Sequence, residues 1–223
     1  MLQNQEQPIE AISAKALALA EILSIIVSCL IAEWVFLSFF SLHRWLVIIP
    51  LTVALLFMVL SHLAYNESAY ALGFRFDNFW SALRLLFWPT ILAVVVILII
   101  GWLSVGPPAV SRLLRPRLLL LPAWALLQQY ALQGFLNRRA QVAFGKGAAS
   151  IFVVGAVFAV LHLPNPVLTI LTFIGGLIWA AVYQREANLL ALAASHTVAS
   201  ISLVLALPLN VINGLRVGFK YFG

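Results

Sequence analysis

Long apolar stretches separated by short polar breaks dominate the pattern along this chain. A helix of about 20 apolar residues spans the hydrocarbon core of a bilayer. By that measure the chain has seven candidate spans, at roughly residues 16–40, 45–64, 80–104, 118–137, 148–163, 166–184 and 188–209. The pattern therefore predicts an all-α fold, a polytopic transmembrane helix bundle of about seven spans, with six to eight as the range.

The breaks between these stretches carry prolines, glycines and charged residues, which end helices and favour turns. None of them is long enough to form a second domain. We therefore expect a polar N-terminal tail at 1–15, a single transmembrane helical domain at 16–209, and a basic and aromatic C-terminal tail at 210–223.

The composition excludes an ordinary water-soluble globule. Hydrophobic residues make up 64% of the chain and charged residues 9%, whereas soluble domains carry about a quarter charged residues. Mean hydropathy is +1.06. The 13 Lys and Arg against 7 Asp and Glu are scattered through short loops, which indicates anchoring at a lipid surface rather than nucleic-acid binding. The expected partner is the bilayer itself, and the even spread of basic loops leaves its orientation open.

The first ten residues are polar and acidic, without a basic region ahead of a short apolar core, so we expect no cleavable signal peptide. Compact loops and the lack of a targeting extension favour an integral, multi-pass protein of a prokaryotic inner membrane. The single cysteine, Cys29, lies in an apolar run and is expected to be a small core residue.

Polar side chains at membrane depth are the informative residues, because each is costly unless it is paired or faces a cavity. The fourth stretch carries Gln128, Gln129 and Gln133, and the last two share a face at helical spacing. The first stretch carries Glu21 and Glu33 near helix ends. For these carboxylates we expect snorkelling or an ion pair with a loop arginine.

Two histidines lie in later stretches. Phe158 and His162 end the fifth stretch at i and i+4, and His196 and Ser200 have the same spacing in the seventh. At about 1.5 Å per helical residue, Gln128, His162 and His196 lie at comparable depths, so we expect them to line one chamber. Interhelical hydrogen bonding without a catalytic role stays open as the alternative.

The order and spacing of these residues resemble the three signatures of the CAAX-protease and bacteriocin-processing (CPBP or Abi) family of intramembrane endopeptidases, which includes the type II CAAX prenyl endopeptidases. Those signatures are Glu-Glu-x-x-x-Arg, Phe-x-x-x-His, and His-x-x-x-Asn or a similar small polar residue. The corresponding positions here are Gln128, Gln129 and Gln133, then Phe158 and His162, then His196 and Ser200. The resemblance covers roughly residues 118–205.

The resemblance implies peptide-bond hydrolysis in a membrane-associated protein or peptide, with the first glutamate and the histidines activating water and the third motif's polar residue stabilising the oxyanion. This chain departs from the pattern because Gln128, Gln129 and Gln133 replace Glu, Glu and Arg. An amide cannot take a proton from water near neutral pH. Loss of all three charges together favours a natural variant whose site is a network of amides bonding one another.

Three functions remain open. The first is a peptidase of divergent mechanism, in which His162 or His196 is the general base, Gln128 and Gln129 orient the water and Ser200 donates to the oxyanion. Gln133, Phe158 and Asn165 would bind substrate or support the site. The second is a pseudoprotease, a membrane protein that binds or scaffolds without cutting. The third, a small transporter, lacks the broken-helix repeat that such folds carry.

Other chemistries fit the residues less well. We expect no cofactor, because His162 and His196 with neutral amides make a poor zinc site, and a catalytic zinc needs three firm ligands. Ser195 precedes His196, but neighbours in a helix point about 100° apart, so the two do not form a serine protease pair.

Overall fold

The computed structural model describes residues 3–39, 45–114, 116–208 and 210–223. Over these residues the chain is helical and contains no strand, which confirms the all-α prediction. The α-helices are α1 (Gln3–Leu30), α2 (Leu37–Phe39), α3 (Ile48–Ala64), α4 (Ala69–Leu72), α5 (Phe79–Val105), α6 (Leu121–Gln129), α7 (Arg138–Phe144), α8 (Ala148–Val160), α9 (Pro166–Arg185) and α10 (Leu189–Ala206). The π-helices are η1 (Ile31–Phe36) and η5 (Tyr130–Asn137), and the 3-10 turns are η3 (Val110–Leu114), η4 (Pro116–Leu120), η6 (Asn213–Leu215) and η7 (Gly218–Phe222).

In the described part of the chain, five helical stretches are long and apolar enough to cross a membrane, at Ser13–Phe39, Trp45–Ala64, Phe79–Val105, Pro166–Arg185 and Leu189–Ala206. The other two predicted spans are also helical. The stretch predicted at 118–137 contains α6 and η5, and that predicted at 148–163 contains the shorter apolar helix α8. The chain is therefore an integral, multi-pass membrane protein.

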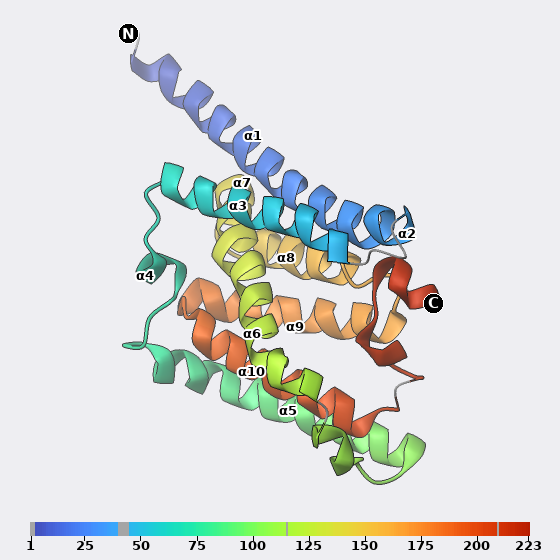
Figure 1. Ribbon diagram of the computed structural model, residues 1–223. Coiled ribbons are helices and arrows are strands. Elements are labelled where there is room, and N and C mark those ends of the chain that lie inside the picture. The colour runs from blue at the N-terminus through green and yellow to red at the C-terminus, as the bar shows by residue number, and fades with distance from the viewer. Residues whose placement is uncertain (1–2, 40–44, 115, 209) are drawn as a thin grey trace.

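The long helices lie roughly side by side. From top to bottom in Figure 1 the order is α1, α3, α8, α9, α10 and α5, and the α6–η5–α7 rod crosses them obliquely. Helix α8 packs on α9, α10 packs on both α5 and α6, and α1 packs on α7. A Cβ atom at Gly176 would lie 2.9 Å from the Cα of Gly155, so these two glycines let α8 and α9 approach closely.

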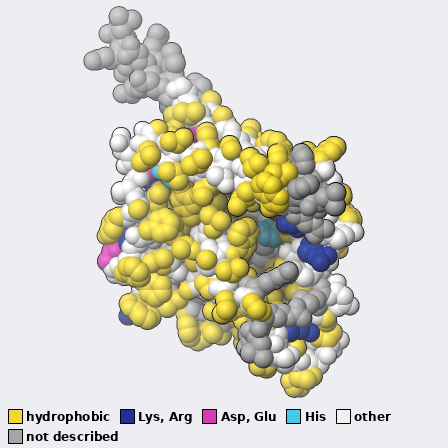
Figure 2. Space-filling model, viewed as in Figure 1, with side chains coloured by type: hydrophobic (Ala, Val, Ile, Leu, Met, Phe, Trp, Pro, Cys, Tyr) yellow, Lys and Arg dark blue, Asp and Glu magenta, His cyan; other side chains and the backbone are white. Residues whose placement is uncertain are grey.

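Hydrophobic side chains cover most of the face seen in Figure 2, and the charged side chains lie mainly at its two edges. Because the long helices run from one edge to the other in the same view, those edges are the helix ends. Large apolar residues such as Leu92, Trp88 and Leu103 are well exposed. This distribution suits a bundle surrounded by lipid, where an apolar exterior costs nothing.

The C-terminal segment packs against the bundle rather than extending from it. The side-chain amide of Asn165 donates to the carbonyl oxygens of Ile212 at 2.9 Å and Arg216 at 3.1 Å. The backbone N–H of Gly218 donates to the Leu163 carbonyl at 2.8 Å, and Ile212 is fully buried. These bonds attach the end of the chain to the turn that follows α8.

Candidate active site

A cavity of about 180 Å³ lies between α5, α6, α9 and α10. Its polar lining residues are Thr90, Gln128, His162, Thr172, Ser195, His196 and Ser200. The remaining lining side chains are apolar, and no aspartate or glutamate is among the described residues of the lining. Four residues singled out in the sequence, on three different helical stretches, therefore share one cavity, as the depth comparison led us to expect for three of them. Their catalytic roles stay predictions.

His162 lies in the turn after α8 and is half-buried on the cavity wall. Its Nδ1 is 2.7 Å from the carbonyl oxygen of Phe158. Because a carbonyl oxygen only accepts, Nδ1 carries the proton in the neutral ring and Nε2 carries the lone pair. The Phe158 ring packs edge-on against the imidazole, with centroids 4.7 Å apart. His162 thus offers one basic nitrogen in a fixed orientation.

His196 lies in the middle of α10 and is buried. Its Nδ1 is 3.3 Å from Nε2 of Gln129, and an amide nitrogen only donates, so Nδ1 accepts and Nε2 carries the proton. The ring of Trp179 stacks on one face, with centroids 4.5 Å apart. Phe158 packs edge-on at 5.9 Å, so it contacts both imidazoles. The two histidines therefore present a lone pair and an N–H, respectively.

The first motif lies across the junction of α6 and a π-helix, which differs from the α-helical spacing assumed from the sequence. Helix η5 begins directly after Gln129, and in a π-helix the hydrogen bonds run from i to i+5. Gln129 and Gln133 are both fully buried, but in the described part of the chain no hydrogen bond joins their side chains. Gln133 instead bonds Asn137, four residues further along the same π-helix.

The three amides therefore do not form the mutual network expected from the sequence. Gln128 lies on the cavity wall, Gln129 bonds His196, and Oε1 of Gln133 accepts from the Asn137 side chain at 2.7 Å. Oε1 of Gln129 and Nε2 of Gln133 are buried without a hydrogen-bond partner among the described residues. Unpaired polar atoms are uncommon in protein interiors and call for an explanation such as a functional site or bound water.

A neutral network does exist, but it extends away from the cavity. Oδ1 of Asn137 accepts from Gln184 at 3.0 Å, and Gln184 also donates to Ser150 at 2.9 Å. These residues belong to η5, α9 and α8, so Gln133 is the first member of a chain of amides that joins three helices. Its contacts match the supporting role predicted for it.

Asn165 is also committed to structural contacts. It caps α9 by accepting from the Leu168 backbone N–H at 3.1 Å, and its amide donates to the C-terminal segment. The side chain is fully buried and does not line the cavity. Of the two roles that the sequence left open for Asn165, the contacts favour support over substrate binding.

Two cavity residues that the sequence did not single out contact the site. Trp179 donates its Nε1–H to Oγ of Ser195 at 3.1 Å, and Oγ1 of Thr90 is 2.7 Å from the same oxygen. Ser195 therefore bonds across the bundle rather than to His196, in agreement with the helical geometry. Trp179 lies in an apolar stretch, where a tryptophan looks like an ordinary core or lipid-facing residue, so no sequence signal identifies it.

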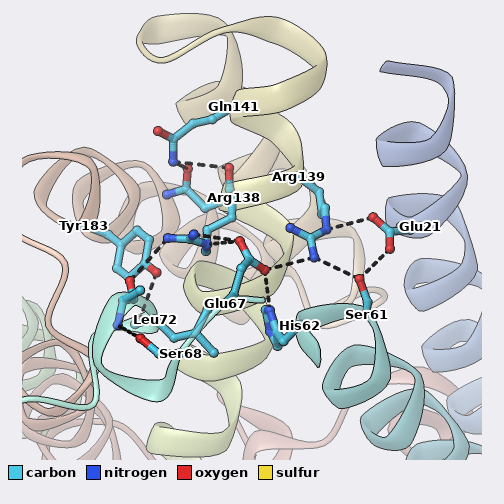
Figure 3. A network of polar contacts seen from close by, with 12 residues as sticks. Glu21, Ser61, His62, Glu67, Ser68, Leu72, Arg138, Arg139, Gln141 and Tyr183 are labelled. Atoms are coloured by element: carbon cyan, nitrogen blue, oxygen red, sulfur yellow. Dashed lines mark hydrogen bonds and ion pairs between the residues drawn. The ribbon is translucent and has the colours of Figure 1, made fainter. Parts of the chain in front are cut away.

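A cluster of charged side chains lies outside the set of residues that line the cavity (Figure 3). Glu21 pairs with Arg139 at 2.7 Å, and Glu67 pairs with Arg139 at 3.0 Å and with Arg138 at 2.6 Å. This confirms the ion pair expected for Glu21, although its partner Arg139 lies in helix α7 rather than in a loop. His62, which sequence reasoning overlooked, lies 2.7 Å from Glu67.

Glu67 lies in the loop after α3, outside the membrane-spanning stretches. Burial of its carboxyl opposes ionisation, but hydrogen bonds from His62, Arg139 and Arg138 outweigh that effect and lower its pKa to about 2. The carboxylate is therefore charged at every physiological pH. In the part of the chain that the structure describes, no group of three His, Cys, Asp or Glu side chains could hold a metal ion.

The comparison with protein families matches residues 112–202 to the family described as "Type II CAAX prenyl endopeptidase Rce1-like". Comparisons with curated proteins and with solved structures give no match. The matched stretch includes all three motifs, from Gln128 to Ser200, and every α-helix that contributes to the cavity except α5. Residues 112–202 are thus similar to the Rce1-like family, in agreement with the resemblance of the three motifs to the CPBP endopeptidases.

Proposed function

We propose that the protein is a CPBP-type intramembrane endopeptidase that hydrolyses a peptide bond in a membrane-associated protein or peptide, with a histidine in place of the usual glutamate as general base. One observation carries the proposal. His162 has its Nδ1 committed to the Phe158 carbonyl, which leaves Nε2 as a basic nitrogen in a residue that lines the polar cavity. Histidine is suited to this role because its ordinary pKa is close to neutrality.

In the proposed reaction, Gln128 orients a water molecule and Nε2 of His162 takes one of its protons. The water oxygen bonds to the carbonyl carbon of the substrate, and the electron pair of the C=O bond moves to the carbonyl oxygen. The oxyanion accepts from the Nε2–H of His196 and from the hydroxyl of Ser200. The C–N bond then breaks, and His162 returns the proton to the leaving nitrogen. Gln129 acts through His196, whose Nδ1 it bonds.

The mechanism uses no cofactor. A zinc ion in the cavity would have His162 and His196 as nitrogen ligands and otherwise only neutral amides and hydroxyls, whereas catalytic zinc sites have three firm protein ligands. We place the protein in a prokaryotic inner membrane on the strength of its compact loops, and its substrate would enter the cavity from the bilayer or its surface.

A pseudoprotease is the second candidate. Two observations favour it: no carboxylate lies among the described residues that line the cavity, and Gln133 is engaged in the amide chain. Such a protein would use the cavity to bind a peptide tail without cutting it.

The test uses purified protein in liposomes with a mixed library of membrane-anchored peptides, prenylated and unprenylated. We expect wild type to cleave and His162→Ala to lose on the order of 10²- to 10⁴-fold in rate, the usual contribution of a general base. His62→Phe is the matched control, because it removes an imidazole outside the cavity and preserves ring packing against Tyr130 and Phe135. Equal turnover by wild type and His162→Ala would refute the proposed base.

A restored variant separates the two candidates. Gln128→Glu, Gln129→Glu and Gln133→Arg together rebuild the family's first motif. If only this variant cleaves, the natural protein is a binder with a peptidase fold. If wild type also cleaves, the histidine mechanism stands, and the prenylated and unprenylated members of the library define the substrate class.

A further inference from the structure

We propose that Trp179 is a positioning residue that fixes which nitrogen of His196 faces the cavity. The catalytic part of this inference rests on the proposed function, whereas the positioning of His196 by Trp179 does not depend on it. Trp179 lies on α9 outside the three motifs, and its ring lies 4.5 Å from the His196 ring with an angle of 33° between the two planes. Both side chains are buried and line the same cavity.

The indole of Trp179 is itself fixed by hydrogen bonding. Its Nε1–H donates to Oγ of Ser195 at 3.1 Å, and that oxygen is 2.7 Å from Oγ1 of Thr90. A chain of polar contacts therefore runs from α5 through α10 to α9 and ends at the ring that covers His196. A buried tryptophan usually finds a partner for its N–H, and that partner fixes the ring orientation.

This support matters because an imidazole has two different nitrogens. Rotation of the His196 ring by half a turn about the Cβ–Cγ bond would place Cδ2 where Nδ1 lies and Cε1 where Nε2 lies, and the bond from Gln129 to Nδ1 would be lost. That bond, at 3.3 Å, is long and weak by itself. The stacked indole, and Phe158 at the ring edge, restrict the rotation. The expected consequence is a single tautomer, with the proton on Nε2 where the oxyanion would form.

The variants remove the two parts of this support separately. Trp179→Phe keeps an aromatic ring and removes the N–H, Ser195→Ala removes the acceptor and keeps the indole, and Trp179→Leu removes both. Trp124→Leu is the matched control, because Trp124 lines the same cavity from α6 and has no ring contact with His196. Trp179→Phe and Ser195→Ala keep the test informative if Trp179→Leu does not fold.

The first readout is the tautomer of His196, measured by nitrogen NMR on histidine-labelled protein in nanodiscs and assigned by replacing each of the four histidines in turn. We expect wild type and Trp124→Leu to show only the Nε2–H form. Trp179→Leu should show a mixture of both tautomers, and Trp179→Phe and Ser195→Ala a smaller admixture. An unchanged tautomer in all three support variants, or an equal change in Trp124→Leu, would overturn the proposal.

The second readout is hydrolysis in liposomes. Trp179→Leu should lower kcat by as much as 10²-fold, the order expected for displacement of a catalytic group by about 1 Å, with a small effect on KM. Unchanged kcat with an altered tautomer would overturn the catalytic part alone. If wild type cleaves nothing, the proposed function fails, and the NMR result still decides whether Trp179 positions His196.

Discussion

Replacing Arg139 with methionine tests whether the buried ion pairs of Figure 3 stabilise the bundle. Arg139 lies on α7 and is 2% exposed, and Glu21 on α1 is 6% exposed. Nε of Arg139 is 2.7 Å from the Glu21 carboxylate, and its guanidinium also lies 4.2 Å from the Tyr65 ring centroid. Without Arg139, Glu21 keeps the hydrogen bond from Ser61 as its one partner among the described residues.

The expected loss is large because one partner of a buried pair is removed and the other charge is left behind. Such changes cost about 3 to 5 kcal/mol, so the free energy of unfolding of Arg139→Met should fall by that amount. Arg138→Met is the matched control. The Arg138 side chain is 29% exposed, and its partner Glu67 keeps Arg139 and His62. We expect it to cost about 1 kcal/mol or less.

A double variant identifies the stranded charge as the cause. Glu21→Gln in the Arg139→Met background should recover about 2 kcal/mol, because a buried amide costs less than an unpaired carboxylate. Denaturant-induced unfolding in detergent micelles, followed by tryptophan fluorescence, measures all four proteins. Equal losses for the two arginine variants, or no recovery in the double variant, would refute the reasoning.

Three further predictions concern single positions. Because the pKa of Glu67 is lowered to about 2 from an ordinary 4.5, its ionisation should stabilise the fold above about pH 4.5 and cease to do so as pH falls toward 2. The difference in melting temperature between wild type and Glu67→Gln should therefore shrink over that interval. A constant difference would contradict this. Asn165→Ala should cost about 1 to 2 kcal/mol and expose the C-terminal segment to limited proteolysis, whereas Asn210→Ala, at an exposed position, should do neither. Gly176→Ala should cost about 1 to 3 kcal/mol of thermal stability through overpacking against the Gly155 backbone, and an unchanged melting temperature would show that α8 and α9 can separate freely.

The sequence by itself determined that lipid surrounds the protein, that the fold is helical, and which residues make up the three motifs. Apolar run length is a local property, so each of the seven predicted stretches is helical in the structure, although five meet the length and hydropathy expected of a span. The family match at 112–202 falls on the region where the motifs lie. The sequence also indicated that Glu21 needs a cationic partner, because an unpaired carboxylate at membrane depth is costly.

Only the tertiary structure decided which groups meet. The choice of Arg139 for Glu21 depends on α7 packing against α1, and no local pattern encodes a contact between residues so far apart in the chain. A π-helix begins directly after Gln129, and Gln133 bonds Asn137 rather than its motif partners; the motif spacing alone does not reveal either feature. Trp179 becomes part of the site because α9 and α10 bring its ring onto His196. The sequence thus specified the polar groups, and helix packing specified their partners.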